Sequence, residues 1–427
     1  MKLAVIGGGS SYTPELLDGL LSRRTRIPVT EVWLMDQDTS RLEINADFAR
    51  RMATRSGAGV TIEATHDLRA AIDGAKYVVT QIRVGQMQAR INDEKLGRKY
   101  GIVGQETTGV GGFACALRTI PRILDVAHTM EELAPAGFLV NFTNPAGINT
   151  EAVLKHSTIK TVGLCNVPIG MIMDCVKHLG GEWHEYELDY VGLNHLSWVR
   201  RFKRNGQDIT AQVLEKFCEH ARDEWEEAPT RESMIAAIRG LGMFCNYYLQ
   251  YFYATDSVLE TLRKKEKTRG EEVVAIENTL FEQYKNPDLV EKPKELGERG
   301  GAHYSTAAFN LIEAIENDLG NQQIVCCRND GAVPTFDENV SVEVPATIGK
   351  NGAVAIPQHT PEPPIRGLMQ LIKAYESLTV AASVSGDREA AFQALITNPL
   401  MPDAKDARRM LDELLDINKE HLRGTFF

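Results

Sequence analysis

The sequence lacks several features that would place a protein in a familiar class at once. No uncharged apolar run reaches the roughly 18 residues of a membrane-spanning helix, and the chain does not open with a charged and then apolar signal segment. Acidic residues outnumber basic ones and give a formal net charge of −11, which argues against nucleic-acid binding. Seven cysteines without a secretory signal argue against a disulfide framework and leave thiols for metals. These absences predict a cytoplasmic protein without nucleic-acid or membrane partners.

Internal repeats, low-complexity tracts and extended linkers are also absent. A chain of 427 residues is nevertheless long for a single hydrophobic core, so two domains are expected. Because no tether separates them, these domains should share an interface.

The chain opens with MKLAVIGGGSSYTPELL, where a short apolar run, three glycines and a helix-like pattern follow one another. Gly7 and Gly9 fit the first two positions of the G-x-G-x-x-G pattern, and Tyr12 stands at the third. Such glycines let the backbone approach a phosphate, and the start of the next helix favours an anion. The stretch therefore indicates a dinucleotide-binding turn, with a Gly-rich turn that binds nothing as the alternative.

Four later apolar runs alternate with helix-like sequence: EVWLMDQD, KYVVTQI, FLVNFTNP and TVGLCNVP. This alternation predicts a parallel sheet, which binds ligands at the carboxyl ends of its strands. Asp36, at the end of the first of these runs, is placed to bind a ribose hydroxyl and favours NAD over NADP, unless it is an ordinary surface acid. The other strand ends are also polar, and they comprise Gly7–Gly9, Gln81–Arg83, Asn141–Asn144 and Cys165–Asn166.

The pattern changes after about residue 185. Apolar and polar residues alternate around an Asn205-Gly206 hairpin signal, and helical stretches follow at about 211–285 and 303–318 before further strands and closing helices. We therefore predict an α/β protein with a Rossmann-type doubly wound parallel sheet over residues 1–185 that binds NAD. An α+β domain over residues 186–427 should bind substrate and complete the catalytic site. The N-terminal half resembles the fold of lactate and malate dehydrogenases.

Cys165 and His195 are candidate ligands of a divalent transition metal. Each stands at the end of an expected strand, beside further polar residues in CNVP and NHLSW. A thiolate and an imidazole suit such a metal and would leave coordination positions for substrate or water. Taken singly, each residue type is more often structural, and their spacing of thirty residues is no established metal signature.

Six stretches, in order along the chain, resemble glycoside hydrolase family 4 and within it the 6-phospho-β-glucosidases: GGGSSYTPEL, GQETTGVGGF, NFTNPAG, GLCNVP, GLNHLSW and RGGAHYSTAA. The resemblance implies a hydrolase that uses NAD and a divalent metal, usually manganese, in a group that departs from two-carboxylate glycoside hydrolysis. In the first stretch, Ser10 and Ser11 join Gly7, Gly9 and Asp36 as implied cofactor-binding residues.

The reaction that the resemblance implies begins with hydride transfer from C3 of the sugar to NAD. The C3 ketone acidifies the C2 proton, a base removes it, the aglycone leaves C1, water adds and the hydride returns. The resemblance assigns Cys165 and His195 to the metal, whose shell the substrate's O2 and O3 complete. Asn166 matches a sugar-contacting position of the family, where Asn accompanies β-linked and Asp accompanies α-linked phosphoglucosides.

The resemblance also implies a tyrosine base within MFCNYYLQYFY, a run that we expect to form one helix. The alignment places the base at Tyr248, with Tyr251 one turn later as the rival. Glu106, in GQETTG, is implied to raise the basicity of this tyrosine. The other aromatic residues of the run are expected to pack in the core.

Arg90 and Asn144 match substrate-binding positions of the family. Arg269 matches a further arginine of the pattern after a one-residue shift, and Arg299 is a weaker candidate. Guanidinium groups suit a 6-phosphate, although helical arginines are usually solvated.

The leading hypothesis is hydrolysis of 6-phospho-β-glucosides, such as cellobiose 6-phosphate, to glucose 6-phosphate and aglycone. An α-linked or unphosphorylated glycosidase is the alternative within the family. An NAD-dependent 2-hydroxy acid dehydrogenase is the rival enzyme class, in which Cys165 and His195 would have no role, and a non-catalytic NAD sensor is a third reading. The family tends to form dimers or tetramers, so we expect a homodimer or homotetramer.

Overall fold

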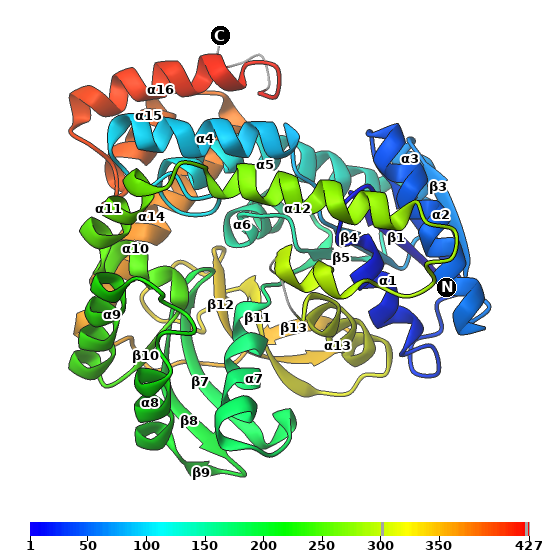
Figure 1. The fold of residues 1–427 in the computed structure, drawn as a ribbon, viewed down its shortest axis with the longest axis horizontal. Helices are drawn as coiled ribbons and strands as arrows, with labels where there is room; N and C mark the ends of the chain where they lie inside the picture. Colours follow the sequence, from blue (N-terminus) through cyan, green and yellow to red (C-terminus); the bar gives the residue numbers. More distant parts are fainter. Residues whose placement is uncertain (300–302, 423–425, 427) are drawn as a thin grey trace.

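The computed structural model describes residues 1–299, 303–422 and 426, and its first half is built on parallel strands (Figure 1). Their order, β3-β2-β1-β4-β5-β6, is that of a dinucleotide-binding sheet. The central strands β4 and β5 are buried along their whole length, whereas β3 is mostly solvent-accessible at the sheet edge. The predicted doubly wound parallel sheet is confirmed. These strands are β1 (Lys2–Ile6), β2 (Glu31–Met35), β3 (Thr61–Thr65), β4 (Tyr77–Thr80), β5 (Phe138–Asn141) and β6 (Lys160–Gly163).

Three antiparallel strands from the second half extend this sheet beyond β6. They are β11 (Asn321–Arg328), β12 (Ser341–Gly349) and β13 (Gly352–Ala355). β11 meets β6 where Cys326 pairs with Gly163, and β12 and β13 follow outward. The sheet therefore draws strands from both sides of the boundary that we expected near residue 185.

A smaller antiparallel sheet forms beside it from β7 (Tyr186–Leu193), β8 (Leu196–Arg204), β9 (Gln207–Asp208) and β10 (Phe244–Cys245). Asn205 and Gly206 connect β8 to β9 with φ angles of 50° and 78°, which confirms the predicted hairpin turn. Asn194 and His195 form the equally short connection between β7 and β8. Because β12 packs on β7, this connection lies close to the larger sheet.

Helices of the first half follow the parallel strands in alternation. Six of them, all but α5, begin just beyond the carboxyl ends of β1 to β6, so their N-terminal N–H groups face the edge where a doubly wound sheet binds ligands. In chain order the helices are α1 (Thr13–Leu21), α2 (Thr39–Ser56), α3 (Leu68–Ile72), α4 (Gln86–Tyr100), α5 (Gly109–Leu133), α6 (Ala146–His156) and α7 (Val167–Leu179).

Helices of the second half pack back onto the first. Figure 1 shows α12 running beside α4 and the C-terminal α16 also lying against α4, while α13 packs on α1 and α14 on α5. Among the described residues, no helix is long and apolar enough to cross a membrane. The α-helices are α8 (Thr210–Glu219), α9 (Ala228–Leu241), α10 (Gln250–Tyr253), α11 (Thr255–Lys264), α12 (Arg269–Tyr284), α13 (Tyr304–Glu316), α14 (Pro363–Ser385), α15 (Arg388–Thr397) and α16 (Ala404–Asn418), and the 3-10 helices are η1 (Trp183–Glu185), η2 (Tyr247–Leu249) and η3 (Lys294–Arg299).

A buried charge cluster fastens α6 to α14. Glu151 is fully buried on α6, and its carboxylate accepts hydrogen bonds from Lys373 Nζ at 2.7 Å and Lys155 Nζ at 2.6 Å. Burial acts to raise the pKa of Glu151, but the two ammonium groups outweigh it and lower the pKa to about 2. The ionised carboxylate is therefore part of the folded state near neutral pH.

We expect Glu151→Gln to lower the free energy of unfolding by about 3 kcal/mol, the low end for a broken buried ion pair, because the buried Lys373 keeps Glu376 as its second carboxylate partner. The folded-state pKa of about 2 lies below the ordinary 4.5, so the carboxylate's stabilisation is complete above about pH 4.5 and is lost as the pH falls toward 2. In urea unfolding, the difference in free energy of unfolding between the wild type and the variant should become smaller as the pH falls below about 4.5. A difference in free energy of unfolding that does not depend on pH would contradict this. Glu43→Gln, at an exposed position of α2, is the control.

Candidate functional site

The metal-ligand candidates come together at the carboxyl end of the parallel sheet. Cys165 follows β6, His195 lies in the turn between β7 and β8, and Cys165 Sγ is 3.3 Å from His195 Nε2. The side chain of Cys165 is partly accessible, whereas that of His195 is 6% exposed. Two residues thirty positions apart are thus joined by the packing of β12 on β7.

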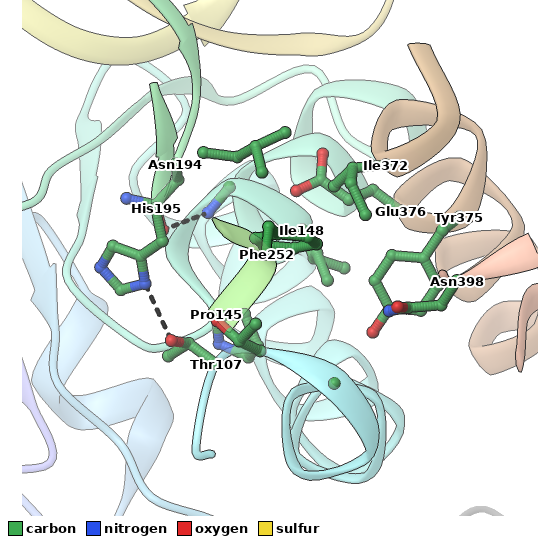
Figure 2. Close-up of a pocket in the computed structure, with 14 residues that line it drawn as sticks. Thr107, Pro145, Ile148, Asn194, His195, Phe252, Ile372, Tyr375, Glu376 and Asn398 are labelled. Carbon is green, nitrogen blue, oxygen red and sulfur yellow. Dashed lines mark hydrogen bonds between the residues drawn. The ribbon is translucent and has the colours of Figure 1, made fainter. Parts of the chain in front are cut away.

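The tautomer of His195 follows from its other neighbour, Thr107 (Figure 2). Thr107 Oγ1 donates its proton to Gln105 Oε1 at 2.8 Å, and the Thr107 backbone N–H fixes the identity of that amide oxygen by donating to it at 2.7 Å. Thr107 Oγ1 must therefore accept from His195 Nδ1–H, which lies 2.8 Å away. The Nε2 lone pair of His195 is left facing Cys165, as in metal-binding histidines.

The electrostatics of this pair fit a divalent transition metal. Burial lowers the pKa of His195 to about 4, so its ring is neutral near pH 7. Burial, with the charge of Glu343 acting in the same direction, raises the pKa of Cys165 to about 12, so a metal would displace the thiol proton. Among the described residues no group of three or more His, Cys, Asp or Glu could hold a metal, so the pair would leave positions for substrate oxygens.

Tyr248 lies directly against this pair. Its ring stacks on that of His195 with 3.7 Å between centroids and 2° between planes. Burial raises the pKa of Tyr248 above its usual value, and the nearby Cys165 adds to this effect while Arg90 opposes it. The phenol therefore stays protonated near pH 7 until more positive charge arrives beside it.

The tyrosine run does not form the single helix that we predicted. It divides into β10, the 3-10 helix η2 and the short α10. The prediction was wrong because Phe244 and Cys245 pair with Val199 and Trp198 of β8, which the local aromatic pattern cannot reveal. The ring centroid of Tyr251 lies 6.2 Å from that of Tyr248, and burial raises the pKa of Tyr251 to about 12.

Glu106 occupies a cluster of charges behind Tyr248. It is ion-paired with Arg83 and, at 2.8 Å, with Arg90. Arg90 also bonds Glu94 at 2.8 Å and is 12% exposed. The carboxylate of Glu106 acts to raise the pKa of Tyr248, the direction expected of a residue that increases the basicity of a phenolate.

The glycines of the first turn are required by close packing. A Cβ on Gly7, whose φ is 96°, would lie 2.7 Å from Gln81 O, and a Cβ on Gly9 would lie 2.8 Å from Asp36 Oδ2. The Gly9 N–H donates to that carboxylate at 2.8 Å. Gly7, Gly9 and Asp36 therefore share one turn at the end of β1 and β2.

The two serines of this turn face different ways. Ser10 is partly accessible, and its Oγ accepts from Tyr12 N–H at 3.2 Å. Ser11 is fully buried and donates to Glu277 of α12 at 2.9 Å. Ser10 thus stays near Gly9 and Asp36, whereas the Ser11 hydroxyl ties the turn to the second half.

Each of the two asparagine candidates stands just before a helix. Asn144 precedes α6, and its carbonyl oxygen accepts from Cys115 Sγ at 3.5 Å. Asn166 is the N-cap residue of α7 and directly follows Cys165. Both stand at carboxyl ends of parallel strands, where the sequence placed them.

The arginine candidates are more dispersed. Arg269 starts α12, is 48% exposed and pairs with Glu272 at 3.0 Å, so it is not joined to Cys165 or His195. It instead lines a cavity of about 130 Å³ that Arg90 and Tyr251 also border. The side chain of Arg299 lies outside the described part of the chain.

Sequence reasoning missed residues that hold the candidate ligands. Gln105 and Thr107, which set the His195 tautomer, stand inside a motif singled out only for Glu106. Glu343, on β12, accepts from Asn194 Nδ2 at 2.9 Å and was unremarkable as one acid in a strand-like stretch. A cavity of about 30 Å³ adjoins His195 and is bordered by Asn194 and Glu376 (Figure 2).

Comparisons with known proteins identify relatives of this chain. Residues 2–181 match the model of family 4 glycosyl hydrolase, and residues 190–401 match that of the family 4 glycosyl hydrolase C-terminal domain. A Bacillus subtilis protein named "Probable 6-phospho-beta-glucosidase" is 41% identical over 100% of this chain and 98% of its own length. A 6-phospho-alpha-glucosidase of Leptotrichia buccalis is 28% identical over 98% of both chains.

Solved structures give the same result. The 6-phospho-beta glucosidase of Thermotoga maritima, solved with manganese, NAD+ and glucose-6-phosphate, superposes with a TM-score of 0.90 at 35% identity over 99% of each chain. The lactate dehydrogenase of Cryptosporidium parvum, 14% identical with a TM-score of 0.55 over 90% of this chain and 98% of its own, shares the fold alone. The chain therefore belongs to glycosyl hydrolase family 4.

Proposed function

We propose that this protein hydrolyses 6-phospho-β-glucosides to glucose 6-phosphate and aglycone, with NAD and a divalent metal, manganese in the first instance, as cofactors. The observation that carries the proposal is the contact between Cys165 Sγ and His195 Nε2, with the ring of Tyr248 stacked on His195, at the sheet edge that also carries the dinucleotide turn. Metal donors, a tyrosine against them and a dinucleotide turn at the same edge of the parallel sheet meet the needs of an oxidation and elimination route, and family membership points the same way.

The β-linkage is supported by the names of the relatives and by one residue of the candidate site. The chain is 41% and 36% identical to curated proteins named as 6-phospho-beta-glucosidases, against 28% for one named as a 6-phospho-alpha-glucosidase. Asn166 follows the metal-ligand cysteine, the residue type that we associated with β-linked substrates. An uncharged amide there can donate to a sugar hydroxyl without adding negative charge beside the metal donors.

The chemistry explains why these groups must act together. A C–H flanked only by hydroxyl-bearing carbons is far too weak an acid for a side chain to deprotonate. When bound, NAD supplies reversible oxidation of C3 and the metal supplies polarisation of the new carbonyl. Tyr248 then takes the proton from C2, while Cys165 and His195 hold the metal and Asn166 contacts the sugar. Glu106 keeps Arg90 in place and raises the basicity of Tyr248.

The phosphate specificity rests on arginines. Arg90 is largely buried and contacts both Glu94 and Glu106, which fix its orientation where it borders the cavity described above. Arg269 borders the same cavity as Arg90 from the start of α12. We assign Arg90, Asn144 and Arg269 to substrate binding, and Gly7, Gly9, Ser10, Ser11 and Asp36 to NAD, with Ser11 acting through the shape of the turn.

We expect release of p-nitrophenol from its β-glucoside 6-phosphate only when NAD and Mn²⁺ are both added to protein stripped of nucleotide and metal. Reactions without NAD, without Mn²⁺ and with the unphosphorylated β-glucoside should remain near background, and NADH should not accumulate. The measurement is absorbance of nitrophenolate under reducing conditions, with reduced nicotinamide followed in parallel.

Two results would point elsewhere. Equal rates with the unphosphorylated or the α-linked compound would favour the other glycosidases of the family. No release, with steady NADH formation from a 2-hydroxy acid, would favour a dehydrogenase, in which the joined Cys165 and His195 have no role.

We further propose a homodimer or homotetramer in the cytoplasm, where NAD and phosphorylated sugars are retained because charged molecules do not cross a bilayer unaided.

A further inference from the structure

A continuous chain of buried polar groups runs beneath the candidate site, and none of its members is assigned a role in the proposed reaction. Ser197, Tyr190 and Asn246 are fully buried, and Glu343 is 1% exposed. Ser197 and Tyr190 belong to the small sheet, Asn246 precedes η2, and Glu343 comes from β12 of the large sheet. Four polar side chains with so little exposure remain in a folded core only when their hydrogen bonds are satisfied.

The hydrogen bonds of this buried polar chain all point one way. Tyr190 donates its phenolic proton to Glu343 Oε2 at 2.5 Å. The Tyr190 oxygen must then accept from Ser197 Oγ, 2.5 Å away, and Ser197 Oγ accepts in turn from Asn246 Nδ2 at 2.9 Å. Each group therefore donates to the next one in the order Asn246, Ser197, Tyr190 and Glu343, and Glu343 is the final acceptor. A carboxylate is suited to this position because it accepts and does not need to donate.

The two ends of this buried polar chain adjoin the His195 turn and the Tyr248 backbone. At one end, Glu343 Oε1 accepts from Asn194 Nδ2 at 2.9 Å, and Asn194 is the neighbour of His195. At the other end, Asn246 Oδ1 accepts from the backbone N–H of Tyr248 at 3.0 Å. His195 and Tyr248, which stack ring on ring, are therefore also linked from below through groups that touch neither ring.

The turn that carries His195 needs such an anchor. His195 has a φ of 64°, a left-handed conformation that costs free energy for a residue with a side chain. Asn194 restrains the turn on two sides, because its Nδ2 donates to Glu343 while its Oδ1 accepts from Gly147 N–H at 3.3 Å. Without the Glu343 contact, one side of this restraint is lost.

We propose that Glu343 and Tyr190 are positioning residues that fix the metal-ligand turn and the base tyrosine relative to each other. The inference rests on the proposed function, because it takes His195 as a metal ligand and Tyr248 as the base. Both carboxylate oxygens of Glu343 accept hydrogen bonds, from Tyr190 and Asn194, and a carboxylate beside the His195 turn favours retention of a divalent cation. Loss of a hydrogen bond in the buried polar chain should therefore weaken metal binding and lower kcat, with a smaller effect on the free energy of unfolding.

Tyr190→Phe tests the proposal, with Tyr186→Phe as a matched control on the same strand. Both tyrosines are buried on β7, but the Tyr186 hydroxyl donates to Gly180 O at 2.6 Å and takes no part in the buried polar chain. Each variant loses one buried hydroxyl, so their melting temperatures should fall by similar amounts. We expect only Tyr190→Phe to weaken Mn²⁺ binding, by about tenfold or more, with a similar fall in kcat and little change in KM.

Mn²⁺ affinity is read from the electron paramagnetic resonance of free Mn²⁺ in the presence of NAD, which does not depend on turnover. Ser197→Ala, a smaller change in the same chain, should shift the affinity in the same direction and serves if Tyr190→Phe does not fold. Glu343→Gln should have the largest effect, because its amide places an N–H group against donors and removes the charge.

Equal Mn²⁺ affinity and kcat in Tyr190→Phe, Ser197→Ala and Tyr186→Phe would overturn the inference while leaving the proposed function intact. Failure of the wild-type protein to bind Mn²⁺ would instead overturn the proposed function, and this inference with it. A weakened affinity confined to Ser197→Ala and Tyr190→Phe, with Tyr186→Phe like the wild type, would support the inference.

Discussion

Cys165→Ser is expected to abolish Mn²⁺ binding at concentrations that saturate the wild type and to lower kcat/KM by about 10³-fold or more. The thiolate is one of only two protein donors that converge here among the described residues, and a neutral hydroxyl is a far weaker ligand. A bound metal contributes several kcal/mol to stabilising charge in the transition state, and about 4 kcal/mol corresponds to the expected factor. The measurements are Mn²⁺ binding and nitrophenol release.

Cys175→Ser is the matched control for this variant. Cys175 is 1% exposed on α7, ten residues further along the chain, and it lies outside the candidate site. A serine there should cost stability through burial of a hydroxyl but should leave Mn²⁺ binding unchanged. Retention of tight Mn²⁺ binding by Cys165→Ser would show that the metal is held elsewhere.

The parallel sheet could be predicted because its central strands are buried on both faces and read as continuous apolar runs, as YVVT and FLVN do. β3, with the sequence TIEAT, was missed because an edge strand with a single buried residue, Ile62, carries no such run. The attachment of β11 to β6 could not be read either, since it depends on a contact between Cys326 and Gly163, far apart in the chain.

In the candidate site, too, the sequence revealed some residues and not others. Glycines, Asp36 and Cys165 were found because they follow recognisable strands, and His195 was found beside them. The residues that orient these groups were not found, because Thr107 and Glu343 reach the metal-ligand turn only through tertiary packing. Family resemblance supplied roles for Tyr248 and Glu106, but local sequence placed the tyrosines on a helix that β10 interrupts.

Two tyrosines compete for the role of base, and their surroundings separate them. Tyr248 stacks on the candidate metal ligand His195, so positive charge held at Cys165 and His195 would directly favour its phenolate. Tyr251 borders the cavity that Arg90 and Arg98 also line, and the charge of Arg90 acts to lower its pKa. Geometry therefore favours Tyr248 as the group that takes the C2 proton.

We expect Tyr248→Phe to lower kcat by about 10²–10⁴-fold with little change in KM, because general bases contribute about this factor and the ring that fills the site is retained. Tyr251→Phe should lower kcat by less than about tenfold. Exchange of the C2 hydrogen of glucose 6-phosphate with deuterated water, in the presence of NAD and Mn²⁺, reports proton transfer apart from aglycone release. It should be lost in Tyr248→Phe and retained in Tyr251→Phe. The opposite pattern would transfer the role to Tyr251, and Tyr248 would then serve to pack His195 in place.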